Sequence, residues 1–118
     1  MSELEDRIVS VAARCIKVCG VLPRNVVGSA NLADQMFRSS TSIAANYAEA
    51  CEAESAKDFV HKLKVAMKEL SETRIWLRLI GEAGYVENTK LADLIGESRE
   101  LSRILSASVT TTKRKMRG

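Results

Sequence analysis

The sequence holds few of the residues that usually build catalytic or metal sites. Among its 118 residues only 4% are aromatic, and there is a single histidine, a single proline and three cysteines. One histidine excludes a di-iron site of the bundle type, which takes a Glu-x-x-His pair from each of two helices. An odd number of cysteines makes no disulfide framework. A phosphate loop is excluded as well, because none of the six glycines forms a G-x-G or P-loop pattern.

Long hydrophobic runs are also missing, since charged residues interrupt every apolar stretch within a few positions. A membrane-spanning helix needs about 20 predominantly apolar residues, so no membrane contact is expected. The first residues are acidic, whereas a signal peptide begins with positive charge. We therefore expect a cytoplasmic protein.

The remaining reactive side chains have simpler interpretations than catalysis. His61 lies off the apolar stripe of its helix, as expected for a surface histidine rather than a metal ligand. Cys15 and Cys19 are one turn apart, but a tetrahedral site wants four ligands, and small core or interface residues are the better interpretation. The hydroxyl cluster at residues 39–42 has no base within the same helical turn. We expect no enzymatic activity, no cofactor and no metal.

Apolar residues, 46% of the chain, recur with helical spacing. Steps of four and three residues run through four segments, which breakers such as Pro23, Gly81 and Gly84 separate. Period-2 alternation typical of strands is absent. The pattern predicts helices at residues 3–21, 29–51, 55–82 and 88–112. Because the second and third connections are short, the expected fold is an all-α, antiparallel up-down-up-down four-helix bundle.

The net charge of +3 comes from the end of the sequence. Four of the eighteen basic residues fall within residues 113–118, which leaves 14 basic against 15 acidic residues in residues 1–112. We therefore divide the chain into a bundle, residues 1–112, and a basic C-terminal tail, residues 113–118. Such a tail can meet phosphate electrostatically, or it can be a disordered, solubilising end.

Three motifs in the middle of the chain carry a family resemblance. They are Arg-Ser-x-x-Ser-Ile-x-x-Asn-x-x-Glu-Ala from Arg38, Ser-x-x-Asp-Phe-x-x-Lys-Leu from Ser55, and Glu-Leu-x-Glu-Thr-x-x-Trp-Leu from Glu69. The chain resembles the four-helix-bundle proteins named after the 23S rRNA intervening-sequence protein, a group that includes accessory proteins of diversity-generating retroelements. The resemblance implies a homopentamer, with subunits packed like staves around a central channel.

Polar residues follow one side of the second and third helices and predict a structural seam between them. Arg38 is expected to pair with Glu69 or Glu72 through a buried, bidentate contact that fixes register; a solvated polar face is the alternative. The predicted polar seam consists of Arg38, Ser42, Asn46, Glu49, Glu69, Glu72 and Trp76.

Second apolar stripes on the first three helices exceed what one small bundle can cover, which indicates assembly with other copies. One functional hypothesis is an oligomeric adaptor that binds RNA or DNA through basic patches, without base stacking because no aromatic residue lies among them. The other is a structural scaffold with a protein partner, such as a reverse transcriptase. The candidate nucleic-acid-binding residues are Arg24, Lys57, Lys62, Lys64, Lys68, Lys113, Arg114, Lys115 and Arg117.

Overall fold

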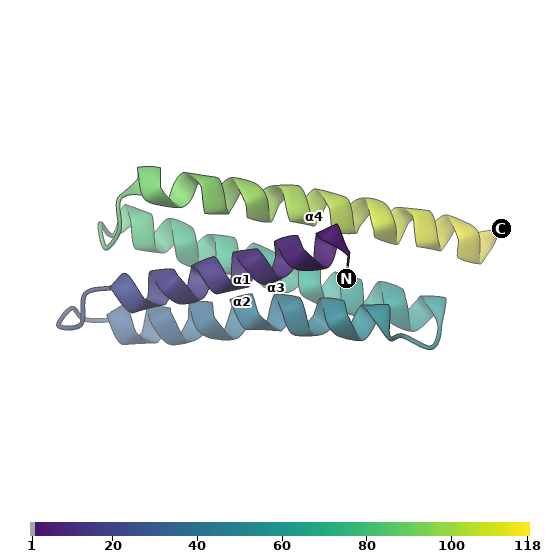
Figure 1. Ribbon diagram of the computed structural model, residues 1–118, viewed down its shortest axis with the longest axis horizontal. Coiled ribbons are helices and arrows are strands. Elements are labelled where there is room, and N and C mark those ends of the chain that lie inside the picture. The colour runs from purple at the N-terminus through teal and green to yellow at the C-terminus, as the bar shows by residue number, and fades with distance from the viewer. Residues whose placement is uncertain (1) are drawn as a thin grey trace.

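Four helices make up most of the chain, and each runs antiparallel to the one before it (Figure 1). The computed structural model describes residues 2–118. The helices are α1 (Glu3–Val21), α2 (Ser29–Cys51), α3 (Ala56–Glu82) and α4 (Asn88–Arg117). They form a rod of 55 × 23 × 22 Å, and the predicted all-α four-helix bundle is confirmed.

The contacts between neighbouring helices are unequal. α2 packs most extensively on α3, followed by α3 on α4 and α1 on α2, whereas α1 and α4 meet over a short stretch only. α4 is the longest helix, and its C-terminal end reaches well beyond the N-terminus of α1 (Figure 1). At that end of the rod, α3 is therefore the principal neighbour of α4.

Local sequence explains where the helices begin and end. The hydroxyls of Ser2 and Ser55 each accept the backbone N–H three residues on, both at 3.0 Å, which satisfies one unpaired donor of the first turn. At the end of α3, Gly84 has φ +78°, a left-handed conformation that glycine adopts without strain. The Tyr85 N–H then donates to the Ile80 carbonyl at 3.0 Å, and the Tyr85 hydroxyl donates to the Val27 carbonyl at 2.9 Å. This last bond ties the two loops at one end of the bundle together.

α4 continues five residues beyond its predicted end and takes in most of the basic segment. The physical reason is that lysine and arginine are good helix formers, and no breaker stands between Thr112 and Gly118. Positive charges in the last turn also interact favourably with the helix dipole. The basic segment is thus the last part of a long helix, which fixes the directions in which its side chains point.

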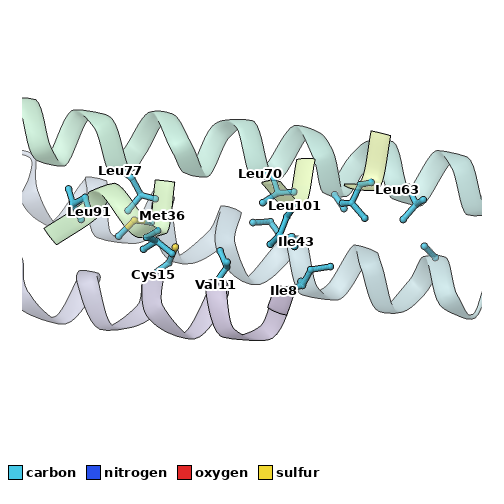
Figure 2. Packing of buried hydrophobic residues seen from close by; sticks show 14 of the residues in the cluster. Ile8, Val11, Cys15, Met36, Ile43, Leu63, Leu70, Leu77, Leu91 and Leu101 are labelled. Atoms are coloured by element: carbon cyan, nitrogen blue, oxygen red, sulfur yellow. The ribbon is translucent and has the colours of Figure 1, made fainter. Parts of the chain in front are cut away.

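The core follows the predicted stripes. Ile8, Ile43, Leu70 and Leu101, one residue from each helix, meet near the middle of the rod (Figure 2). Nearer the loops at residues 22–28 and 83–87, Cys15, Met36, Leu77 and Leu91 form an equivalent layer (Figure 2). Asn46, a member of the predicted polar seam, is half-buried.

Several large apolar side chains stay exposed outside this core. They lie on α1 and α2, on the C-terminal half of α3, in the first loop and near the end of α4: Val9, Ile16, Val21, Phe37, Ile75, Leu79, Val26, Val27 and Met116. Among residues 2–118, no helix has the length and apolar character needed to cross a bilayer.

Candidate nucleic-acid interface

Arg38 on α2 bridges two glutamates of α3. One nitrogen of its guanidinium, Nη1, lies 3.0 Å from Glu69 Oε2, and the other, Nη2, contacts Glu72 Oε2. Glu72 also accepts from the indole Nε1 of Trp76 at 3.1 Å. The arginine thus holds α2 against two successive turns of α3, as the sequence pattern predicts.

The seam differs from the prediction in its burial and in its geometry. Arg38 is half exposed, and its two terminal nitrogens bind two different carboxylates, whereas a buried, bidentate contact was predicted. Further along, the Asn46 amide donates to the carbonyl and hydroxyl of Ser42, within its own helix. Glu49 instead pairs with Lys62 across the seam at 2.8 Å. These contacts either join α2 to α3 or lie within α2.

The reactive side chains singled out in the sequence differ in their burial and bonding. His61 is exposed. Burial raises the pKa of the Cys15 thiol to about 12, which keeps it protonated and unreactive. The Cys19 thiol donates to the Ala33 carbonyl at 3.4 Å. Within residues 2–118 no three His, Cys, Asp or Glu side chains stand close enough together to hold a metal ion.

The most distinctive charged feature lies along the outer edge between α3 and α4. On α3, Lys57, Lys64 and Arg78 recur at intervals of seven or fourteen residues, which keeps them on one side of the helix. Arg99 and Lys113 on α4 are likewise fourteen residues apart. With their neighbours in this register they define what we call the α3–α4 basic face: Lys57, Lys64, Lys68, Arg74, Arg78, Arg99, Lys113 and Arg117.

At one end of this face, cations from the two helices lie next to each other. The proximity of the Lys64 ammonium lowers the pKa of Lys113, and Arg117 adds a smaller contribution in the same direction. Like charges this close repel each other unless an anion stands between them. The arrangement is therefore suited to accepting a negative ligand.

Arg74 lies between the two helices at the middle of the face. Its Nη1 donates to the Ser98 carbonyl at 3.2 Å and to Ser102 Oγ at 2.9 Å, and its Nη2 donates to Ser71 Oγ at 3.2 Å. Partial burial lowers its pKa, and the nearby charge of Arg99 lowers it further. All of its partners are neutral, so its charge is not neutralised.

The carboxylates of α3 and α4 mostly turn away from this face. Glu69 and Glu72 bind Arg38 on the α2 side, Glu97 binds Arg7 of α1, and Glu100 binds Arg103. Within the described residues, no member of the basic face forms an ion pair, whereas Arg7, Arg38, Lys62 and Arg103 each do. Uncompensated positive charge thus collects on one edge of a bundle with a small net charge.

The surface along α3 contains two shallow hollows. One, of about 350 Å³, is lined by Lys64, Met67, Lys68 and Ser71. The other, of about 200 Å³, is lined by Ile75, Arg78, Leu79 and Glu82, so the only carboxylate bordering either hollow stands at the far end of the face. Basic and apolar side chains therefore both line this surface: Lys64 and Lys68 border the first hollow, and Arg78 lies beside Ile75 and Leu79 at the second.

The other predicted binding residues lie elsewhere. Lys62 pairs with Glu49 on the α2 side, and Arg24 lies in the first loop, at the opposite end from Lys113. Arg114 and Lys115 follow Lys113 on α4 but point to other sides of the helix, because successive residues are rotated by about 100°. Sequence reasoning missed Arg74, Arg78 and Arg99. The seven-residue spacing from Lys57 and Lys64 to Arg78 was the available signal, but Arg99 required knowledge of how α4 packs on α3.

Comparison with known proteins agrees with the fold. The sequence profile of the 23S rRNA-intervening sequence protein family matches residues 4–107. A solved structure from Bacteroides thetaiotaomicron VPI-5482, described as a protein of unknown function from the S23 ribosomal protein family, is 30% identical with a TM-score of 0.81. The match covers 90% of this chain and 97% of that one. No curated protein matches the chain. Because the profile runs from the start of α1 to residue 107 within α4, the chain belongs to the 23S rRNA-intervening sequence protein family.

Proposed function

We propose that this protein is a non-enzymatic, self-assembling scaffold that binds nucleic acid along its phosphate backbone through the α3–α4 basic face. The observation that carries the proposal is that cations without an ion-pair partner among the described residues stand on two helices that pack against each other, with Arg74 of α3 hydrogen-bonded to Ser98 and Ser102 of α4. Phosphate contacts supply most of sequence-independent affinity, and lysine and arginine make them.

Self-assembly is supported by apolar surface on two different sides of the bundle. Ile75 and Leu79 lie on α3, whereas Val9, Ile16 and Phe37 lie on α1 and α2, and each of the five side chains is more than 40% exposed. When two different patches of one subunit meet in successive copies, the contact is head-to-tail and closes into a ring if the rotation allows. A ring, such as the homopentamer that the family resemblance implies, would repeat the basic face and strengthen weak binding through avidity.

The same apolar patches favour a second candidate, a scaffold that docks a protein such as a reverse transcriptase. Large exposed apolar patches mark protein interaction sites in general, and they do not specify self over another partner. The two candidates differ in what the basic face does. If the protein is only a protein scaffold, nucleic acid either does not bind detectably or binds equally well after the charges of the basic face are removed.

A binding titration with matched charge variants tests the proposal. Fluorescence anisotropy of a labelled RNA or DNA is measured across a range of KCl concentrations for the wild type, for Lys64→Gln/Lys113→Gln and for Lys17→Gln/Lys90→Gln. The last variant removes the same charge from exposed positions off the face. We expect the first variant to flatten the log–log salt slope by about 0.7–0.9 for each lost phosphate contact, with little change in the control. Light scattering checks that the oligomeric mass is unaffected.

Two results would contradict the proposal. Absence of binding by the wild type at low salt would leave the protein scaffold as the better hypothesis. Equal losses in the two variants would show that net charge, rather than the basic face, determines affinity.

A further inference from the structure

The basic face runs along two uninterrupted helices, with its charges in two rows. On α3, Lys57 and Arg78 are separated by about 32 Å at 1.5 Å per residue, and on α4, Arg99 and Arg117 are separated by about 27 Å. Both rows lie on uninterrupted helices that pack side by side (Figure 1). Cations fixed at such spacings suit a partner whose phosphates are also fixed over about 30 Å.

A nucleic-acid duplex has that property. Its persistence length is about 150 bp, and one turn of B-form duplex spans about 34–36 Å, so its backbone is rigid over the length of the face. Helices in contact lie about 8–10 Å apart, and their outward side chains diverge further, a separation comparable to the width of a duplex groove. The two rows can therefore contact the two strands that border one groove.

Polar groups that can contact phosphate and sugar oxygens lie between the two rows. Arg74 and the hydroxyls of Ser71 and Ser102 lie there, already connected by hydrogen bonds. Arginine and serine side chains commonly contact phosphate and sugar oxygens, which positions a protein on a duplex without reading sequence.

Features that favour single strands are missing from the face. Proteins that bind single strands stack bases on aromatic side chains, at about 1–3 kcal/mol per base. All five aromatic residues have other locations: Trp76 is bonded to Glu72 at the α2–α3 seam, Tyr85 to the first loop, Phe59 packs on the core, and Phe37 and Tyr47 are on α2. A flexible strand would also lose more conformational entropy on a straight track than a duplex does.

Building on the proposed function, we infer that the ligand of the α3–α4 basic face is double-stranded nucleic acid, RNA or DNA, held along its backbone without sequence preference. Single-stranded nucleic acid of the same length binds more weakly.

The test compares ligands and positions on the full chain. Anisotropy titrations use a labelled unstructured RNA strand of about 20 nucleotides, the same strand in an RNA duplex, and a DNA duplex of the same sequence. We expect both duplexes to bind at least about tenfold tighter than the single strand. Lys64→Gln/Lys113→Gln and Arg78→Gln/Arg99→Gln neutralise points about 21 Å apart on α3. Both should weaken duplex binding and flatten the salt slope to a similar extent, whereas Lys17→Gln/Lys90→Gln should not.

The possible failures are distinguishable. Single-strand binding equal to or tighter than duplex binding overturns this inference and leaves the proposed function standing. An effect of Lys64→Gln/Lys113→Gln without any effect of Arg78→Gln/Arg99→Gln also overturns it, because it indicates a local anion site rather than a track. If no ligand binds, the proposed function fails as well. Circular dichroism and thermal melting confirm that each variant is folded.

Discussion

The hydroxyl of Thr73 on α3 donates to Ser39 Oγ on α2 at 2.8 Å, with both residues completely buried. Thr73 Oγ1 is also 2.8 Å from the Glu69 carbonyl, and Ser39 Oγ is 3.4 Å from the Met36 carbonyl. Each hydroxyl has one proton, so one donates across the interface and the other to its own helix. The bond requires α2 and α3 to be in register, because a shift would leave buried hydroxyls without each other.

We expect Thr73→Val to cost about 1–2 kcal/mol, because Ser39 is left with only a long bond to Met36. Ser39→Ala should cost less, since Thr73 can still donate to Glu69. Replacing both removes both polar groups, so the double variant should be less destabilised than the sum of the single variants by about 1 kcal/mol. Urea unfolding of the four proteins measures this difference, and strictly additive costs would show that the two hydroxyls do not interact.

Arg38→Ala should destabilise the bundle more than Arg103→Ala. Arg38 joins two helices through two carboxylates, whereas Arg103 pairs with Glu100 within α4 and is 70% exposed. Because Arg38 itself is half exposed, the expected cost is about 1 kcal/mol, well below that of a dry ion pair. Thermal melting of both variants decides the order, and equal melting temperatures would mean that the Arg38 bridge contributes nothing measurable.

Replacing each of two glycines by alanine should change the stability of the bundle in opposite directions. Gly84 has φ +78° at the end of α3, where a side chain is strained, so Gly84→Ala should cost about 1 kcal/mol. Gly96 is exposed within α4, with open space where a Cβ would stand. There, alanine should stabilise by up to about 1 kcal/mol. A loss of stability in Gly96→Ala would contradict the helical, unobstructed environment assigned to that position.

The buried Cys15 thiol should make stability fall at alkaline pH. Burial raises its pKa from 9.0 to about 12, so the folded protein keeps the proton while the unfolded chain releases it above pH 9. Ionisation then favours the unfolded state, by up to about 1.4 kcal/mol per pH unit between pH 9 and 12. Between pH 8 and pH 10.5, the urea concentration at the unfolding midpoint should fall further for the wild type than for Cys15→Ala. Identical falls would assign the alkaline loss to other groups.

Burial could be predicted from the sequence where the spacing of apolar residues along a single helix was sufficient evidence. The stripe from Leu63 through Leu70 to Leu77 repeats every seven residues, so its burial needed no knowledge of the partner helices. The pairing of Arg38 with Glu72 was also predictable, because the two polar ridges lie on consecutive helices joined by a short loop. Its half exposure was not, since sequence does not tell how far a ridge lies from the centre of an interface.

The basic face depended on tertiary structure. Lys64 and Lys113 are far apart in sequence, and their contact exists because α4 returns antiparallel along α3 and stays helical past Thr112. In the sequence, Lys62 and Lys64 look equivalent. In the structure, Lys62 pairs with Glu49 and Lys64 lies beside Lys113. The sequence shows which residues are charged, but it does not show which of them form ion pairs.

The last four cations of α4 offer a test of whether position matters within the basic segment. Lys113 and Arg117 are one turn apart on the basic face, while Arg114 and Lys115 point to other sides of the same helix. If the helix is the binding element, Lys113→Gln/Arg117→Gln should flatten the salt slope of duplex binding by about 0.7–0.9 per lost phosphate contact, and Arg114→Gln/Lys115→Gln should change it little. Both variants remove the same charge, so each is a control for the other. Neither should lower the melting temperature, because these side chains are exposed and Lys113 already experiences repulsion from Lys64. Equal losses of binding in the two variants would mean that the segment acts as an unstructured polycation, and its helical register would then have no part in recognition.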